Sequence, residues 1–216
     1  MSADEVGLAP ALSSERLILR HWRRSDRAPF ASLNADPEVM RHFPATLTRA
    51  ESDAMIDDFQ ARLAEHGYGL WALESVADGR FIGFTGLNHV SPALPFAPAV
   101  EVGWRLARSA WGHGYASEAA RTSLAVAFDD LALAEVVSFT TVANERSRAV
   151  MRRLGMTHDP AEDFEHPRIP AGSPVRPHVL YRLRARDWRS GSYPATAAEA
   201  SQPQPASESA SRAGAP

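Results

Sequence analysis

Cysteine is absent from this chain of 216 residues. Without a thiol, the protein cannot form disulfides, bind zinc through sulfur or use a cysteine nucleophile. No run of about 18 apolar residues occurs, so we expect no membrane-spanning helix and no membrane partner. Residues 1–20 lack a basic start followed by an apolar stretch, so they do not resemble a secretory signal. These absences favour a cytoplasmic location.

A strong charge of either sign is also missing, because the formal net charge is only −3. Nucleic-acid-binding proteins usually carry a basic patch or stripe. The one local cluster of basic residues contains Arg20, Arg23, Arg24 and Arg27, is interrupted by Asp26, and has no aromatic ladder beside it. We therefore expect a solvated turn beside an edge strand and no nucleic-acid partner.

Hydrophobic residues make up 44% and charged residues 23% of the chain, the balance of a soluble globular protein. Large apolar residues are scarce at both ends. Such segments bury too little surface to offset the entropy lost on ordering. We therefore expect residues 1–11 and 190–216 to be disordered and residues 12–189 to form one folded domain.

The clearest helix is predicted between Thr48 and Glu65. Thr48 and Glu51 have the spacing of a capping box, and Gly67 follows at the position where helices often end. Other helical patterns are a helix that begins at Ser25-Asp26, a helical turn at 36–40, and helices over 116–131 and 147–154.

Strand patterns alternate with these helices. Two of the strands flank Asp78-Gly79, a strong hairpin signal. The predicted strands cover residues 16–21, 69–75, 81–90, 100–106, 136–142 and 178–183. Because helices and strands alternate and hairpins join several strands, the expected fold class is α+β (mixed α/β). Its centre would be a mixed, mostly antiparallel twisted sheet with helices on both faces.

A glycine-containing turn between a strand and a helix carries the strongest chemical signal. The segment EVGWRLARSAWGHGYASE ends a strand near Leu106, places Gly112 and Gly114 in the turn, and then starts a helix. Glycines allow a close backbone approach, and the free N–H groups of a helix start bind anions. Arg108 and His113 are candidate side-chain partners of a phosphate. A tight turn without any ligand fits the same pattern.

A second turn lies after the strand predicted over 136–142. Asn144 is followed by Ser147 at the start of the short helix that Gly155 closes. From spacing alone, both residues are read as helix caps.

Together these segments resemble a known family. The sequence WGHGYASEAARTSLAVAFDDLALAEVVSFTTVANERSRAVMRRLGM resembles the coenzyme-A-binding half of GNAT superfamily N-acetyltransferases. The segment LSSERLILRHWRRSDRAPFASLNADPEVMRHFP is similar to the RimJ/RimL type, and the resemblance spans residues 12–185. One departure is Ser109, which occupies the position where the family's pyrophosphate loop often has Arg or Gln. The backbone amides of the glycine turn are unaffected by it.

The resemblance implies direct transfer of an acetyl group from acetyl-CoA to a primary amine in a ternary complex, without a metal. It implies that pantetheine lies beside the strand 100–106, and that a main-chain N–H there stabilises the oxyanion. The implied catalytic residues are Glu101 as base and Ser147 near the sulfur, with Asp36, Glu38 and His89 as weaker bases. The implied coenzyme A contacts are Trp104, Arg105, Leu106, Arg108, Gly112, His113, Gly114, Tyr115, Ala116, Asn144 and Ser147.

The acceptor is left open between a protein N-terminus, an amino sugar and a small-molecule amine. The Pro-rich loop 160–177 is expected to border its site, because loops carry specificity. Two other functions remain: a domain that binds acyl-CoA as a sensor without catalysis, and a phosphate- or nucleotide-binding domain. The missing P-loop lysine argues against the latter. A homodimer is one assembly that this interpretation allows.

Overall fold

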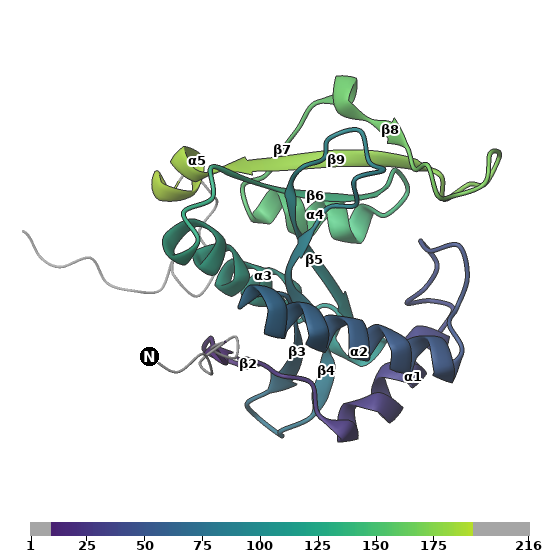
Figure 1. Cartoon of the computed structure of the whole chain (residues 1–216), viewed down its shortest axis with the longest axis vertical. Helices are drawn as coiled ribbons and strands as arrows, with labels where there is room; N and C mark the ends of the chain where they lie inside the picture. The colour runs from purple at the N-terminus through teal and green to yellow at the C-terminus, as the bar shows by residue number, and fades with distance from the viewer. Residues whose placement is uncertain (1–9, 192–216) are drawn as a thin grey trace, which may run out of the picture.

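The structure, a computed structural model, describes residues 10–191. Within these residues the strands form one sheet in the order β1-β2-β3-β4-β5-β6-β9-β7, with β8 also paired to β9. Every pair is antiparallel except β5 and β6, which are parallel (Figure 1). The strands are β1 Leu12–Ser13, β2 Leu17–Arg20, β3 Leu70–Ser75, β4 Phe81–His89, β5 Val100–Leu106, β6 Glu135–Thr141, β7 Thr157–His158, β8 Phe164–Glu165 and β9 Pro177–Arg184.

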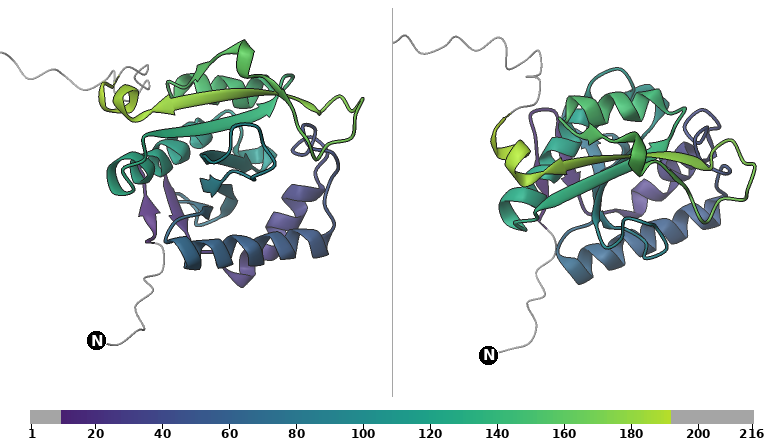
Figure 2. Two further views of the ribbon diagram at one scale, coloured as in Figure 1. Left: turned by 45° about the horizontal axis from the view of Figure 1, so that its top comes forward. Right: turned by 90° about the horizontal axis from the view of Figure 1, so that it is seen from above.

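Helices cover both faces of this sheet, as the sequence predicts. Helices α1 and α2 lie together on one face, and α3 and α4 lie on the other (Figures 1 and 2). The helices are α1 Arg27–Ala35, α2 Arg49–His66, α3 Tyr115–Ala125, α4 Glu145–Arg153 and α5 Ala185–Arg189. Short 3-10 turns occupy Arg24–Asp26, Arg108–Ala110 and Pro160–Glu162, and a π-helical segment occupies Val126–Asp130. The fold class predicted above is therefore confirmed.

An aromatic cluster joins α1 and α2 to the sheet. The ring of Trp22 lies 5.0 Å from Phe30, 5.6 Å from Phe59 and 5.7 Å from Phe81, measured between centroids. Its indole N–H donates to the carbonyl of Leu70 at 2.8 Å, so the buried polar atom is satisfied. The cluster fixes the helix pair against the strands that lead into the candidate site.

The capping box predicted for α2 is present. The Thr48 hydroxyl accepts from the backbone N–H of Glu51, and the Glu51 carboxylate accepts from the backbone N–H of Thr48. Gly67 ends the helix with φ of +72°, a left-handed conformation that glycine adopts without strain.

The prediction for the basic cluster near residue 20 is wrong for Arg20. This residue is only 6% exposed, and its guanidinium binds Asp26 at 2.7 and 2.9 Å and Glu74 at 2.6 Å. Asp26 also accepts from the backbone N–H of Arg23 and does not cap α1 with its side chain. The charges pair because the β2–α1 turn folds over β3, a long-range contact that the local sequence does not encode.

Elsewhere, the boundaries shift in ways that have local causes. The helix predicted over 116–131 is α-helical to Ala125 and then widens into the π-helical segment, where the Leu131 N–H reaches the Val126 carbonyl. Strands β1, β7 and β8 have two residues each and leave no periodic pattern to detect. Most of the two terminal segments predicted to be disordered lies outside the described residues.

Candidate active site

The parallel strands β5 and β6 separate soon after they meet. They pair at a single register, Glu101 opposite Val137, and then run in markedly different directions (Figure 1). A regular parallel pair would continue bonding along both strands. The separation leaves a wedge in the sheet, open toward the C-terminal ends of β5 and β6.

The main chain of β5 supplies free polar groups to this wedge. Just outside the two ends of β5, Ala99 and Ala107 form backbone hydrogen bonds with the chain of β4 and its flanks. In an antiparallel pair, every second residue of a strand is hydrogen-bonded to the partner strand. Residues 101, 103 and 105 therefore bond to β4, whereas the N–H and C=O groups of Val102, Trp104 and Leu106 face β6. The carbonyl of Leu106 accepts from the indole N–H of Trp111 at 3.0 Å. The N–H and C=O groups of Trp104 lie where the wedge has opened.

The glycine turn lies at the end of β5 and starts α3. Gly112 and Gly114 both have φ of +81°, a conformation that other residues adopt only with strain. Gly114 is the N-cap residue of α3, so no side chain caps the first N–H groups of this helix, including that of Ala116. His113 stacks on Tyr115 with ring centroids 5.5 Å apart. This geometry suits the predicted binding of an anion through main-chain amides, which stays a prediction.

Two arginines lie near this turn. Arg108 has an exposed side chain, and its Nε is 3.9 Å from the Asp36 carboxylate. Arg146, at the start of α4, places its guanidinium 4.2 Å from the centre of the Trp111 ring. Sequence reasoning missed Arg146, although it lies between Asn144 and Ser147. Its approach to Trp111 depends on how α4 packs, which the local pattern does not show.

Asn144 caps α4, as its spacing predicts. Its side-chain oxygen accepts from the Ser147 N–H at 3.3 Å, and its amide nitrogen donates to the Thr140 hydroxyl at 2.8 Å. The Ser147 hydroxyl itself makes no hydrogen bond within the described part of the chain, so it is available to a ligand beside β6.

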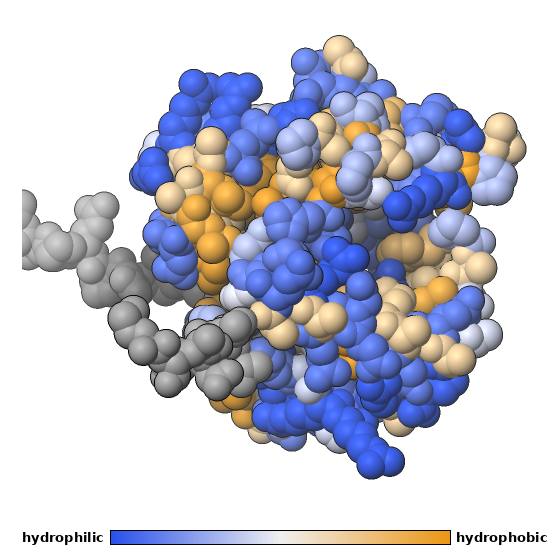
Figure 3. Space-filling model, in the orientation of Figure 1, coloured by the Kyte–Doolittle hydropathy of each residue, from blue (hydrophilic) through white to orange (hydrophobic). Residues whose placement is uncertain are grey.

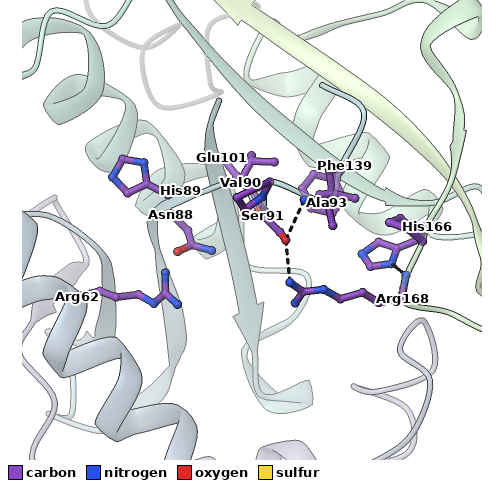
Figure 4. A pocket seen from close by; sticks show the side chains of 13 residues that line it. Arg62, Asn88, His89, Val90, Ser91, Ala93, Glu101, Phe139, His166 and Arg168 are labelled. Atoms are coloured by element: carbon purple, nitrogen blue, oxygen red, sulfur yellow. Dashed lines mark hydrogen bonds between the residues drawn. The ribbon is translucent and has the colours of Figure 1, made fainter. Parts of the chain in front are cut away.

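Glu101 lies in the wall of a pocket of about 390 Å³ (Figure 4). Burial raises the pKa of this carboxyl to about 8. Within residues 10–191, no hydrogen bond or ion pair reaches it. The pocket is lined by Arg62, Asn88, His89, Val90, Ser91, Pro92, Ala93, Leu94, Glu101, Phe139, His166, Pro167 and Arg168. The predicted loop 160–177 therefore borders the same pocket as Glu101, through its residues 166–168.

The loop between α1 and α2 spans both sides of the wedge. The His42 ring nitrogen Nδ1 lies 3.1 Å from the Thr141 hydroxyl on β6. On the β5 side, the Arg105 guanidinium lies 4.1 Å from the centre of the Phe43 ring and donates to the Asn34 side-chain oxygen at 2.7 Å. The Arg105 side chain thus packs against α1 and its following loop, and its main chain bonds to β4, so Arg105 stays only a predicted coenzyme A contact.

The weaker base candidates have other partners. Glu38 forms an ion pair with Arg41 at 2.6 Å, and an Asp36 oxygen accepts from the Glu38 N–H. His89 lines the pocket with Glu101, but its Nε2 lies 2.8 Å from the Tyr68 hydroxyl. The Glu101 carboxyl differs from these candidates in having no hydrogen-bond or ion-pair partner within residues 10–191.

The surface around this region is recessed. Figure 3 shows a hollow between the half that carries β6 and β9 and the half that carries α1 and α2, with both hydrophilic and hydrophobic residues at its rim. Within residues 10–191, no group of three or more His, Cys, Asp or Glu side chains could hold a metal ion. Nor is any helix of the described chain long and apolar enough to cross a membrane.

Comparisons with known proteins agree with this geometry. The acetyltransferase (GNAT) domain family matches residues 16–157. FsC-acetyl coenzyme A-N(2)-transacetylase from Aspergillus fumigatus is 31% identical over 186 residues, which cover 83% of this chain and 78% of that protein.

Solved structures give the same result. An acetyltransferase from Agrobacterium tumefaciens is 29% identical, with a TM-score of 0.66 and coverage of 81% of this chain and 94% of that one. The RimL ribosomal L7/L12 α-N-protein acetyltransferase in complex with coenzyme A has a TM-score of 0.63, covering 81% of this chain and 98% of that one, but only 18% identity, so this likeness concerns the fold alone. The wedge, the glycine turn and these matches lead to one conclusion: the chain belongs to the GNAT acetyltransferase family and is an acyltransferase.

Proposed function

We propose that this protein acetylates a primary amine by direct attack in a ternary complex, with Glu101 as the general base. The observation that carries the proposal is the environment of Glu101: a carboxyl in a pocket wall with no partner among residues 10–191 and a pKa raised to about 8. A base is most efficient when its pKa lies near the operating pH. Glu101 can therefore take the proton of an attacking ammonium group, directly or through a water molecule.

The wedge residues fit the acyl donor. The Trp104 N–H faces the opening and would donate to the thioester carbonyl, an interaction that in other enzymes contributes about 3 kcal/mol. The Gly112–Gly114 turn would hold the pyrophosphate through main-chain amides, with Arg146 as a nearby cation. Ser147, whose hydroxyl has no partner in the described chain, would lie beside the sulfur. Acetyl-CoA supplies the acyl group as a thioester, and these residues hold it in place.

The acceptor enters from the side of the pocket that contains Glu101. A pocket of about 390 Å³ is within the size range of small-molecule sites. The similarity to the RimJ/RimL type favours a protein N-terminus as the alternative acceptor, because a flexible terminus can also enter an open pocket.

A thiol-release assay tests this proposal. Purified protein is mixed with acetyl-CoA and a panel of amines and N-terminal peptides, and free coenzyme A is followed. All 23 basic residues are arginine, so the protein has no lysine amine of its own to consume acetyl-CoA. We expect thiol release that depends on the added amine.

The same assay separates the alternatives. Binding of acetyl-CoA with no turnover on any amine would indicate a sensor and contradict the proposed catalysis. Absence of a thermal shift with every coenzyme A ester would contradict coenzyme A binding itself.

A further inference from the structure

The arginines that line the pocket with Glu101 differ in whether they have an acidic partner. Two of them line it, Arg62 from α2 and Arg168 from the loop between β8 and β9 (Figure 4). Arg62 already has a carboxylate partner, since its Nε lies 2.8 Å from Asp58 one helical turn away. Arg168 has no acidic partner within residues 10–191.

The Arg168 side chain is nevertheless held in place. Its Nη2 donates to the hydroxyl of Ser91, another residue of the pocket lining, at 2.8 Å, and its backbone N–H donates to the His166 ring nitrogen Nδ1 at 3.3 Å. Figure 4 shows the guanidinium extended toward Ser91 and the Glu101 side of the pocket. Since a guanidinium has five donor hydrogens, most of them remain free for a ligand.

A comparison within the same loop shows that this arrangement is specific to Arg168. Arg176 forms an ion pair with Glu165 at 2.7 Å and donates to the Ile169 carbonyl at 2.7 Å, so it holds the loop together. Arg168 makes neither kind of contact and faces the pocket instead. The loop thus has one structural arginine and one exposed arginine without an acidic partner among residues 10–191.

The neighbouring imidazole does not offset this charge. His166 also lines the pocket, and burial, followed by the charges of His178 and Arg168, lowers its pKa. Because its Nδ1 accepts from the Arg168 N–H, the neutral ring carries its proton on Nε2 and is another hydrogen-bond donor. No lining residue other than Glu101 is acidic.

We propose that the acceptor is a small amine that also carries an anionic oxygen group, with its amine beside Glu101 and its anion on Arg168. This inference rests on the proposed function and names the substrate class of the same site. A carboxylate fits the planar guanidinium through two parallel hydrogen bonds, and a phosphate offers the same oxygen chemistry. Polyamines are disfavoured, because the two arginines repel a second positive charge.

The walls leave room for an apolar group on the acceptor. Val90, Leu94 and Phe139 line the pocket beside the polar groups, and Val90 and Leu94 are themselves nearly buried. An amino acid or a derivative with a free carboxylate has all three features: an amine, an anion and an apolar side chain.

Matched acceptors test the charge requirement. Thiol release is measured with leucine and phenylalanine, with their amides, with an aminoalkyl phosphate and with a diaminoalkane, each at saturating acetyl-CoA. We expect kcat/KM for the free acids or the aminophosphate to exceed that of the amides and the diamine about tenfold or more. The anion class with the higher kcat/KM, carboxylate or phosphate, identifies the anionic group of the acceptor.

Variants then locate the anion site. Arg168→Met should raise KM for the anionic acceptors about ten- to hundredfold and leave the neutral amides within about twofold. Arg168→Lys should restore part of the loss, because it returns the charge without the planar fork. Arg24→Met is the matched control: Arg24 is exposed, lies outside the pocket, and its loss should change neither class of acceptor.

Two results would overturn the inference and leave the proposed acetyl transfer intact: amides or diamines used as well as the acids, or an equal loss with all acceptors in Arg168→Met. Binding of acetyl-CoA without turnover on any acceptor would instead remove the proposed catalysis, and this inference with it. Because acetyl-CoA binding is read separately by thermal shift, the two failures are distinguishable.

Discussion

Two glutamates, one on β5 and one on α3, have opposite surroundings. Glu118, in the first turn of α3, accepts from the Ser14 hydroxyl at 2.7 Å and from the backbone N–H and side chain of Arg16 at 2.9 and 2.7 Å. Its pKa is lowered: burial acts in the opposite direction, but the bonds from Ser14 and Arg16 outweigh it. Glu101, on β5, has no such partner within the described residues, and burial raises its pKa to about 8.

The difference separates a carboxylate that holds two segments together from the carboxylate that we propose as the base. Glu118 attaches the β1–β2 segment to α3, and its bonds favour the charged form. The Glu101 carboxyl is buried, and no hydrogen bond or ion pair within residues 10–191 stabilises its charged form. Proteins keep such a group mainly where it binds a ligand or reacts. The same contrast separates Arg176 from Arg168 and Arg20 from Arg105. The Arg105 guanidinium contacts the Asn34 oxygen and the Phe43 and Phe84 rings, with no acidic partner among residues 10–191, and burial lowers its pKa to about 10.

Removal of the Glu101 carboxylate should have the largest effect. Glu101→Gln keeps the shape of the side chain but cannot accept a proton, so we expect kcat to fall about 10²- to 10⁴-fold, the usual contribution of a general base. The KM for acetyl-CoA should change little. Steady-state kinetics with a varied amine measure both values, and a kcat within about threefold of wild type would show that another group is the base.

The stability of Glu101→Gln gives an independent check. A folded-state pKa of about 8 against 4.5 means that the folded state holds the proton more tightly. This contribution to stability is complete below pH 4.5 and is lost as pH rises through 8. The variant should therefore gain thermal stability relative to wild type at pH 9 and not at pH 4. A loss at both pH values would indicate a structural role like that of Glu118.

A substitution in the glycine turn should have the next largest effect, on the affinity for acetyl-CoA. Gly114→Ala places a Cβ at φ of +81° and crowds the main-chain amides that would hold the pyrophosphate. We expect the Kd for acetyl-CoA, measured by calorimetry, to rise about ten- to hundredfold.

Gly112→Ala provides the matched comparison for this turn, because it has the same φ and open space around it. A Cβ there meets the same backbone strain, of about 1–2 kcal/mol, so the two variants compare the two glycines of the turn under equal strain. Equal Kd values for wild type and both variants would contradict the proposed pyrophosphate site.

Loss of the Glu118 charge should affect stability more than activity. Glu118→Gln leaves Arg16 without its partner, and we expect a loss of about 1–3 kcal/mol in the free energy of unfolding at pH 7, with kcat near the wild-type value. Because the pKa of Glu118 is lowered in the folded state, its contribution is present above pH 4.5 and is lost as pH falls below that value. Urea denaturation at pH 7 and pH 3 measures this. The account fails here if activity falls as far as in Glu101→Gln.

The smallest effect is expected from Ser147→Ala. Ser147 contributes one hydroxyl without a partner in the described chain, and the cap of α4 uses its backbone N–H, which the variant keeps. We expect kcat to fall severalfold, the usual size for one neutral hydrogen bond. A loss of 10²-fold or more would instead make Ser147 the acid that protonates the leaving sulfur.

Local rules predicted the elements that local interactions form. The capping box at Thr48, the Asp78-Gly79 hairpin and the glycine turn depend on a few adjacent residues, and each is found where expected. Glu101 could be proposed from the family resemblance and Asn144 from its spacing.

What the sequence could not predict depends on contacts between distant segments. The missing partners of Glu101 become visible only when β4, β5, α2 and the loop after β8 surround it. The burial of Arg20 requires β3 beside β2, and Arg168 and Arg146 enter their sites only through packing. Charged residues were therefore the least predictable class, since the same side chain is solvated, paired or left unpaired according to its tertiary neighbours.

The most direct test of the central claim is the pH dependence of kcat/KM in wild type and in Glu101→Gln. A general base must be unprotonated to act, so wild-type kcat/KM should rise with pH and level off above an apparent pKa near 8. The residual activity of Glu101→Gln should lack this transition. A wild-type profile that is flat between pH 6 and 9, or a transition near pH 8 that persists in Glu101→Gln, would contradict the account.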